Sequence, residues 1–498
     1  MSLRFVIGRS GSGKTTFLLK EMKERLLSDP LGDPLIYIVP DQMTFLSEYK
    51  LLSDPDIKGL MRLNVYSFNR LALRILQETG GISRVPIDST GLQMLIKKVI
   101  EEQKNHLRVY RQAADKFGFL EHVENTLSEL KRYTVHPDEL AFYQEREDLP
   151  QTLKDKLHDI ELVFREVEQY LHNRYLASED TLRLLVEKIP EAKYLRNAEI
   201  YIDGFYDFTP LEYSIINELL KVSARVTIAL TVDKPYPDEA PDPLSLFATP
   251  GGTYTTIHEI AITNGIPVEE DVILTAGKRF THPSLSYLEE NFASMPVKPF
   301  ADESKLAIAE AANPRAEIAG IGRKIISLVR DYGYRFKDIA VLVRNGETYY
   351  DLFETIFTDM NIPFYVDQKR SMLNHPLIEL LRSSLETITS NWRRDPVFRA
   401  VKTDLLFPLD RSLPELREQM DRLENYCLAY GIQGERWLMR DKWQYRRYRS
   451  LEMDFPQTDQ EKEIEREINE SRELVRAPLI RLANRLQKAK NVREMCVA

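Results

Sequence analysis

Eight residues near the start of the chain have the types and spacing needed to bind phosphate. The run, which matches G-x-x-x-x-G-K-[ST] at every defined position, is Gly8, Arg9, Ser10, Gly11, Ser12, Gly13, Lys14 and Thr15. Glycines at this spacing let consecutive backbone N–H groups turn toward one anion, and the lysine can reach the β- and γ-phosphates. The threonine hydroxyl is a ligand for Mg²⁺. We therefore predict an ATP site formed by these eight residues, with Thr15 as a Mg²⁺ ligand.

An aspartate further along the chain is a second candidate for the same site. Residues 199–203 read as an apolar strand that ends in an acid, Asp203. In P-loop enzymes an acid after a strand helps to hold Mg²⁺, so we predict that Asp203 joins Thr15 at the metal. An acid that merely ends a strand is the alternative. The next residue is Gly204, where a glutamate that positions the attacking water is usual, so we expect slow hydrolysis.

Two further polar segments follow predicted strands. The first contains Asp41, Gln42 and Thr44, and the second contains Phe68 and Arg70. Open α/β sheets place their ligands at the carboxyl ends of their strands, where both segments should lie. Polar side chains can read base edges, arginine can pair with guanine or phosphate, and phenylalanine can stack on unpaired bases. The pattern suits a track for single-stranded DNA, and ordinary loop residues are the alternative.

Basic and aromatic residues also alternate within residues 436–449. The mixture suits a single-stranded backbone with stacked bases, and a helix whose aromatic side chains pack inward explains it equally well. The eight histidines are scattered, and neither Cys427 nor Cys496 belongs to a cluster that would hold zinc or an iron–sulfur centre. We find no carboxylate cluster typical of a nuclease centre, so the catalytic residues stay unassigned.

The elements that must position these residues form an α/β pattern. Strands are predicted at 3–7, 35–39, 63–68, 199–203 and 225–231. Strands that alternate with helices indicate a parallel sheet. Charged segments with helical periodicity separate the third strand from the fourth. We therefore predict a first core from residues 1–86 and 193–298, interrupted by a helical insertion at 87–192.

A second α/β core is predicted to begin near residue 299. Strands are expected at 306–311, 338–344 and 364–367. Helices are expected from about residues 315 and 349. Beyond residue 375 the pattern is helical, without strands that would complete the second sheet. We therefore predict the start of a second core at 299–375 and a helical insertion, truncated, at 376–498.

Composition limits the class of protein. The chain has 498 residues and 43% hydrophobic content, which suits several domains with real cores. No stretch approaches the roughly 18 consecutive apolar residues of a membrane span, and no leader pattern is present, so we expect a cytoplasmic protein without membrane contact. The formal net charge of -9 argues against a small basic DNA-binding domain, although a large acidic protein can carry a basic groove.

The order of the motifs resembles one family. The chain contains, in this order, GRSGSGKT, VPDQMTF, VYSFNRL, YIDGFYDFTP, DIAVLVR and MLNHPLIE. Over essentially its whole length it resembles the N-terminal part of AddB, a component of the bacterial AddAB ATP-dependent helicase/deoxyribonuclease. The resemblance implies a P-loop NTPase of the superfamily 1 helicase type, with two RecA-like parallel-sheet cores that each carry a helical insertion.

The resemblance also implies a function. Members of this family form a heterodimer with an AddA-type helicase–nuclease subunit and act on single-stranded and double-stranded DNA in double-strand break repair by homologous recombination. They recognise the Chi sequence on the 3′-ended strand. By position, the family's Chi-reading residues correspond to Asp41, Gln42, Thr44, Phe68, Arg70 and Phe205, of which the last is added by the resemblance. The family's nuclease domain and iron–sulfur cluster lie beyond the matched part, so neither is expected here.

Three hypotheses follow for the biochemical activity. The first is a subunit that binds ATP, Mg²⁺ and single-stranded DNA with little motor activity of its own, in agreement with Gly204. The second is an active ATP-driven helicase motor in which another acid replaces the missing glutamate. The third is a P-loop kinase of a small metabolite, which would need an acceptor pocket and a lid in place of long helical insertions.

Overall fold

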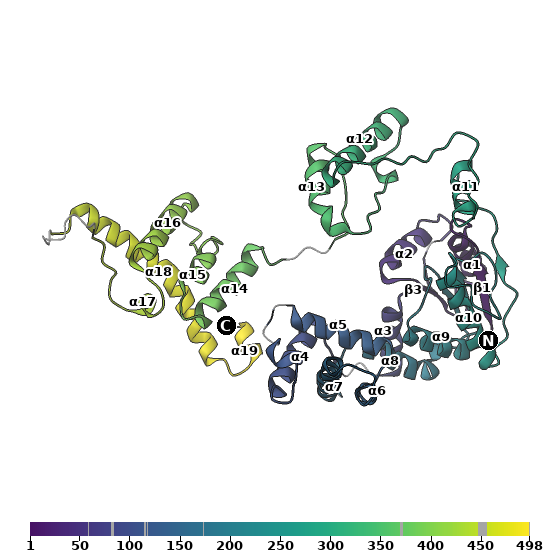
Figure 1. Ribbon diagram of the computed structural model, residues 1–498, viewed down its shortest axis with the longest axis horizontal. Coiled ribbons are helices and arrows are strands. Elements are labelled where there is room, and N and C mark those ends of the chain that lie inside the picture. The colour runs from purple at the N-terminus through teal and green to yellow at the C-terminus, as the bar shows by residue number, and fades with distance from the viewer. Residues whose placement is uncertain are drawn as a thin grey trace. The chain divides into compact units, whose positions relative to one another are not determined.

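The computed structural model describes residues 1–57, 59–80, 84–113, 116, 118–172, 174–368, 372–446 and 456–497. The chain divides into two compact units, Met1–Ala309 and Glu310–Ala498. The first unit runs from purple to teal in Figure 1, and the second runs from green to yellow. The domain boundary predicted at 298/299 therefore lies inside the first unit.

The first unit is built on a six-stranded sheet in which every strand pair is parallel. Its strands, in spatial order, are β3 (Leu63–Tyr66), β2 (Leu35–Ile38), β6 (Glu199–Ile202), β7 (Arg225–Leu230), β1 (Leu3–Ile7) and β8 (Val272–Ile273). The strands predicted for this core are confirmed with small shifts at their ends. The short β8 has no counterpart among them, because two residues are too few to show a strand pattern. Since β6 pairs with β2, the helical insertion interrupts the sheet in sequence and not in space.

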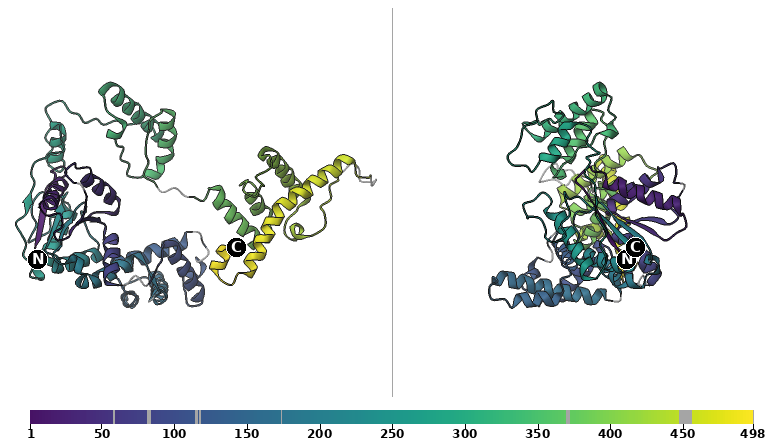
Figure 2. Two further views of the ribbon diagram at one scale, coloured as in Figure 1. Left: turned by 180° about the vertical axis from the view of Figure 1, so that it is seen from behind. Right: turned by 90° about the vertical axis from the view of Figure 1, so that its right-hand side faces the viewer.

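Apolar side chains cover both faces of this sheet and alternate along its strands. In β2, Ile36 and Ile38 pack on one face, whereas Leu35 and Tyr37 pack on the other. Helices α3, α8, α9 and α10 cover the first face, and α1 and α2 cover the second (Figure 2). Their bounds are α1 (Lys14–Ser28), α2 (Thr44–Leu52), α3 (Phe68–Thr79), α8 (Ser178–Lys188), α9 (Pro210–Val222) and α10 (Ala248–Thr263). Burial of both faces explains why the strands read as continuous apolar runs.

The segment between β3 and β6 is helical, as predicted. Its helices are α4 (Ser89–Glu102), α5 (Phe119–Arg132), α6 (Pro137–Gln144) and α7 (Gln151–Leu171). They surround a hydrophobic cluster of their own, separate from the sheet. The two-residue strands β4 (Val85–Pro86) and β5 (Tyr175–Leu176) pair where the chain leaves and re-enters the sheet region. Helix α8 follows β5 and packs on the sheet through Leu185, so it belongs to the core and not to the insertion.

The second unit is helical within the residues described. Helices α12 (Pro314–Tyr332) and α13 (Tyr350–Asp359) share one hydrophobic cluster and start where the sequence predicts. The helices that follow are α14 (Pro376–Thr389), α15 (Arg394–Val401), α16 (Leu413–Tyr430), α17 (Glu435–Leu438), α18 (Asp459–Lys488) and α19 (Val492–Val497). A second cluster is formed by α15 to α18 and by the chain between these helices. Helix α11 (Pro283–Asn291) belongs to the first unit.

The strands predicted for a second core are not formed. Residues 306–311, 338–344 and 364–367 are irregular apart from short turns, and residues 310–498 contain no strand where the structure describes them. The apolar side chains of Ile308 and Leu342 are fully exposed. A strand satisfies its backbone N–H and C=O groups only by pairing with a neighbour, and the described residues supply no neighbour here. The parallel-sheet part of the predicted fold therefore holds for the first core alone.

The aromatic residues of the 436–449 segment pack inward. Trp437 and Trp443 are buried in the cluster of the second unit, with ring centroids 5.0 Å apart. Their burial favours the alternative in which the aromatic side chains serve packing, while Arg447, Tyr448 and Arg449 lie outside the described residues. Among the helices that the structure describes, none combines the length and the apolar character needed to cross a membrane.

Candidate nucleotide site and the adjoining sheet edge

The glycine-rich loop between β1 and α1 has the backbone geometry of an anion cradle. Gly11 and Gly13 adopt left-handed conformations with φ of 81° and 96°, which other residues rarely adopt. A Cβ atom on Gly8 would lie 2.4 Å from the Leu274 carbonyl oxygen and 2.6 Å from Ser12 Oγ. Helix α1 begins directly after the loop at Lys14, so its unpaired N–H groups and positive dipole end face the loop.

Polar groups of this loop fit a phosphate ligand. Ser12 Oγ is buried and has no hydrogen-bond partner among the described residues. The Lys14 ammonium group donates to the carbonyl oxygens of Gly8 at 2.7 Å and Arg9 at 3.0 Å. Burial lowers the pKa of Lys14 to about 8, while the charge of Asp203 opposes this shift and that of Arg279 adds to it. An unpaired hydroxyl and a desolvated amine are the donors that phosphate oxygens would satisfy.

The two residues predicted to hold Mg²⁺ are in direct contact. Thr15 Oγ1 donates to Asp203 Oδ2 over 2.6 Å, and the buried Tyr37 hydroxyl donates to the same oxygen over 2.9 Å. Asp203 Oδ1 accepts the backbone N–H of Gly204 at 2.9 Å. The described residues contain no group of three or more His, Cys, Asp or Glu side chains that could hold a metal by themselves. This fits Mg²⁺, which is commonly held by one or two protein groups together with substrate phosphates and water.

Gly204 occupies a position that a glutamate cannot take without rearrangement. Its φ is 86°, in the left-handed region. A Cβ atom there would lie 3.0 Å from Met43 Sδ and 3.1 Å from Pro40 Cδ. The backbone after Asp203 therefore turns tightly against the segment that follows β2. This turn leaves no carboxylate beside Asp203 at the position where P-loop hydrolases commonly have one.

Three charged residues that no sequence pattern singled out also lie at the glycine-rich loop. The backbone N–H groups of Lys278 and Arg279 donate to the Gly11 carbonyl oxygen at 2.9 and 3.2 Å. The Lys278 side chain passes so close to Gly13 that a Cβ atom there would lie 3.2 Å from its Cδ. Glu289 of α11 accepts from Arg9 Nε over 2.6 Å. No local pattern identifies these residues, because only folding brings them to the loop from about 270 residues away in the sequence.

The polar residues predicted to read bases lie at the carboxyl edge of β2 and β3, as strand order requires. Asp41 and Gln42 are exposed in the short helix η1 (Asp41–Met43), whereas Thr44 is buried and donates to the Asp41 carbonyl oxygen at 3.0 Å. Asp41 and Asn69 side chains approach to 3.5 Å across the edge. The exposed Arg70 side chain lies 3.9 Å from Glu48. Pairing of β2 with β3 thus brings the two predicted segments together.

The two aromatic candidates differ in their environment. Phe68 is 4% exposed and packs against Phe205 and Phe208, with ring centroids 5.6 and 6.2 Å away. Phe205 is half-buried at the rim of this aromatic group. Tyr206, which follows it, is 70% exposed. The structure therefore places Phe68 in the core beneath Phe205, while Phe205 and Tyr206 border the surface.

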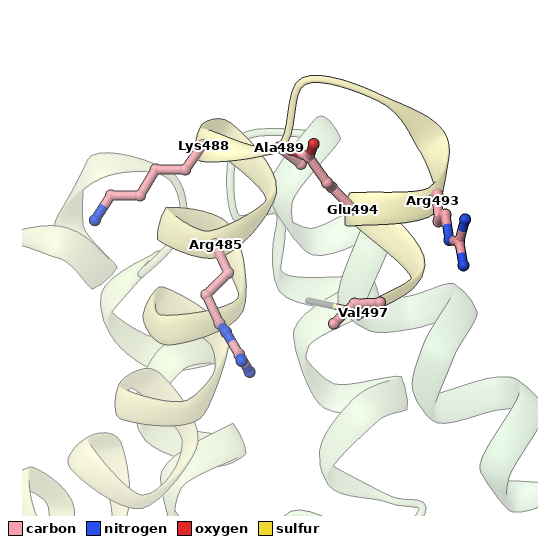
Figure 3. A pocket seen from close by; sticks show the side chains of 6 residues that line it. All are labelled: Arg485, Lys488, Ala489, Arg493, Glu494 and Val497. Atoms are coloured by element: carbon pink, nitrogen blue, oxygen red, sulfur yellow. The ribbon is translucent and has the colours of Figure 1, made fainter.

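A cavity of about 420 Å³ in the second unit is unrelated to these residues. It lies at the end of α18 and beside α19, and Figure 3 shows its lining residues Arg485, Lys488, Ala489, Arg493, Glu494 and Val497. The side chains of Lys488 and Arg493 point in opposite directions in Figure 3. Its charges do not converge on one point, and it contains none of the residues predicted to bind nucleotide or DNA.

Comparison of the whole sequence with known proteins finds related proteins and a matching family. Residues 5–289 match the model of a family described as "ADDB, N-terminal". Over its full length the chain is 48% identical to the B subunit of the ATP-dependent helicase/deoxyribonuclease of Geobacillus kaustophilus (strain HTA426) and to that of Geobacillus thermodenitrificans (strain NG80-2). It is 46% identical to the protein of the same name from Bacillus cereus (strain AH187). The chain spans 43% of the length of each of these relatives.

Proposed function

The chain belongs to the AddB family, and on that premise we propose that it is the nucleotide-binding and strand-reading part of a helicase/deoxyribonuclease subunit. The relatives are named as the B subunit of such an enzyme, so the partner we propose is an AddA-type helicase–nuclease subunit in a heterodimer. The process we propose is double-strand break repair by homologous recombination in the cytoplasm. The family's nuclease and iron–sulfur chemistry is not assigned to the residues of this chain.

The contact between Thr15 and Asp203 carries the proposal of an ATP·Mg²⁺ site. A hydroxyl at the start of α1 and a carboxylate after β6 meet at 2.6 Å beside a glycine loop with an unpaired buried hydroxyl. Bound Mg²⁺ would offset the negative charge of the phosphates. Lys14 would bind the β- and γ-phosphates. Asp203 would accept a hydrogen bond from the Thr15 hydroxyl, which leaves the oxygen lone pairs of Thr15 available to Mg²⁺. The loop N–H groups would bind the remaining phosphate oxygens.

Weak turnover is the second part of the proposal. Its support is Gly204, which stands where a glutamate commonly orients the attacking water and whose left-handed backbone and close neighbours disfavour a larger residue. Binding of ATP would then serve to hold the first unit in one conformation more than to drive movement. An active helicase motor is the competing function, and it requires another group to position the water.

Measurement of ATP binding and hydrolysis, with and without single-stranded DNA, tests this function. The unchanged chain is compared with Lys14→Ala, which removes the phosphate-binding amine. We expect binding that Lys14→Ala weakens, with turnover that single-stranded DNA does not raise. Strong DNA-stimulated turnover that disappears in Lys14→Ala would instead establish a motor. Turnover of a small metabolite without DNA would favour the kinase alternative.

Strand reading is proposed for the carboxyl edge of β2 and β3. Asp41, Gln42 and Arg70 present polar groups to solvent there, and Phe205 lies half-buried at the adjoining edge of β6. These groups suit hydrogen bonds to base edges and stacking on an unpaired base. Thr44 and Phe68 are buried, so we propose that they hold η1 and Phe205 in place for recognition of Chi on the 3′-ended strand.

A further inference from the structure

A buried tyrosine, Tyr37, contacts the candidate metal site from inside the sheet. Tyr37 is fully buried in β2, and its hydroxyl donates to Asp203 Oδ2 over 2.9 Å. Thr15 of α1 donates to the same Asp203 oxygen over 2.6 Å. Side chains from three separate segments of the chain thus meet through the two hydrogen bonds that this oxygen accepts.

The Tyr37 hydroxyl is a polar group in an otherwise apolar layer. Its strand neighbours Leu35 and Val39 belong to the same hydrophobic cluster, so a phenylalanine ring would serve packing equally well. Burying a hydroxyl without a hydrogen-bond partner costs about 1–3 kcal/mol. The Tyr37 hydroxyl is tolerated in this layer because Asp203 accepts its hydrogen bond. Burial and the charge of Asp203 raise the pKa of Tyr37 well above its usual value. The hydroxyl therefore keeps its proton and acts as a donor.

Three donors fix the orientation of the Asp203 carboxylate. Oδ2 accepts from Thr15 and Tyr37, and Oδ1 accepts from the Gly204 backbone N–H. A carboxylate held on both oxygens cannot rotate freely within its buried position. Loss of a group that orients a metal-holding side chain commonly weakens metal affinity by about 10–100-fold. Tyr37 is placed to have such an effect, because its fully buried side chain donates directly to Asp203.

We propose that Tyr37 is a positioning residue that holds Asp203 for nucleotide-bound Mg²⁺. The inference rests on the proposed function and adds to its nucleotide site a residue that contacts Asp203 from inside the sheet.

The experiment that tests this role compares Tyr37→Phe with Tyr201→Phe in the full chain. Tyr201 is a matched control, because it is equally buried on the same face of the sheet and hydrogen-bonds the carboxylates of Glu21 and Glu199. A fluorescent, non-hydrolysable ATP analogue is titrated in EDTA, and Mg²⁺ is then titrated into the complex. We expect Tyr37→Phe to weaken Mg²⁺ binding about tenfold with unchanged analogue affinity in EDTA. Tyr201→Phe should change neither quantity.

The outcomes separate the inference from the function on which it rests. Equal Mg²⁺ affinity in Tyr37→Phe and the unchanged chain would overturn the positioning role. An equal loss in both tyrosine variants would also overturn it, because a general packing effect would then explain the change. Failure of the unchanged chain to bind the analogue would overturn the proposed nucleotide site, and the inference with it.

Discussion

At the scale of single residues, we predict that Lys14 makes the affinity of the proposed site for nucleotide depend on pH. Its pKa is lowered by burial to about 8 in the ligand-free protein, and phosphate oxygens favour the charged amine. Affinity should be greatest below pH 8 and should fall by up to about tenfold per pH unit above it, because binding must then protonate the amine. Titration of the ATP analogue in EDTA from pH 7 to pH 10 measures this.

Lys14→Arg is the control for this pH dependence. A guanidinium stays charged throughout the range, so the affinity of Lys14→Arg should be flat above pH 8. The unliganded fold should respond with the opposite sign. Its Lys14 pKa lies below the unfolded value of 10.5, so the free energy of unfolding should rise as the pH goes from about 8 toward 10.5. An affinity in the unchanged chain that is constant from pH 7 to pH 10 would contradict the prediction.

Gly204 offers a second prediction at this scale. Gly204→Glu restores the residue type common in P-loop hydrolases, but its Cβ would meet Met43 and Pro40 in a left-handed backbone conformation. We expect a loss of about 1–3 kcal/mol in the free energy of unfolding and no gain in ATP hydrolysis. Urea denaturation and a phosphate-release assay measure the two quantities. Gly204→Ala separates the backbone strain from the carboxylate, and vigorous hydrolysis by a stable Gly204→Glu would refute the expectation.

Arg70 and Phe68 should affect DNA recognition differently. Arg70→Ala should weaken binding to a Chi-containing strand about tenfold more than binding to a scrambled strand, with unchanged stability, because its side chain is exposed. Phe68→Ala removes a buried ring and should also lower the free energy of unfolding by about 3–5 kcal/mol. Strand affinity and urea denaturation are measured together. Arg74→Ala is the control on the same helix, because Arg74 stacks on Tyr194; equal loss on both strands in Arg70→Ala would refute the assignment.

At the scale of elements, one carboxylate fixes the connection between α4 and α5 onto α7. Asp159 of α7 is fully buried and accepts the backbone N–H groups of Arg108, Val109 and Tyr110 at 2.7 to 3.1 Å. The helical insertion thus depends on a polar contact that apolar periodicity does not reveal. Its neighbour Asp155 pairs with Arg108 at the surface.

These two aspartates give a matched prediction for the insertion. Asp159→Ala should lower the free energy of unfolding by about 3 kcal/mol, because buried N–H donors lose their acceptor. Asp155→Ala should change it much less, because ion pairs at the surface contribute little to stability. Urea denaturation measures both, and hydrogen exchange in α4 to α7 locates the change. Similar losses in the two variants would show that burial of Asp159 is not the cause.

At the scale of the whole molecule, the residues of the proposed nucleotide site all lie within the first unit. Its residues come from the loop after β1, from β2, from the end of β6 and from the loop after β8. Each hydrophobic cluster is likewise formed within one unit. The described structure therefore predicts that a ligand at the glycine-rich loop stabilises the first unit directly.

Hydrogen exchange tests this prediction for the whole chain. A nucleotide present at 100 times its Kd stabilises the state that binds it by about 2.7 kcal/mol. We expect slower exchange in β1, β2, β6 and α1 when the ATP analogue and Mg²⁺ are present, with no change in α16 and α18. Lys14→Ala at the same analogue concentration is the control. Equal slowing in α16 and α18 would contradict the prediction.

The sequence by itself determined the glycine-rich loop, the strands of the first core and the helical character of the insertion. These features depend on local requirements: glycine where φ is positive, apolar runs where a strand is buried on both faces, and helical periodicity. The motif pattern also predicted that Thr15 and Asp203 share a site, whereas only the tertiary structure decided that Thr15 donates directly to Asp203, that Tyr37 donates to Asp203, and that Lys278 lies against the loop. Those contacts join residues far apart in sequence, so no local pattern encodes them. The apolar segments at 306–311 and 338–344 show that a local pattern can also predict a strand that does not form. A strand forms only where a neighbouring strand accepts its hydrogen bonds.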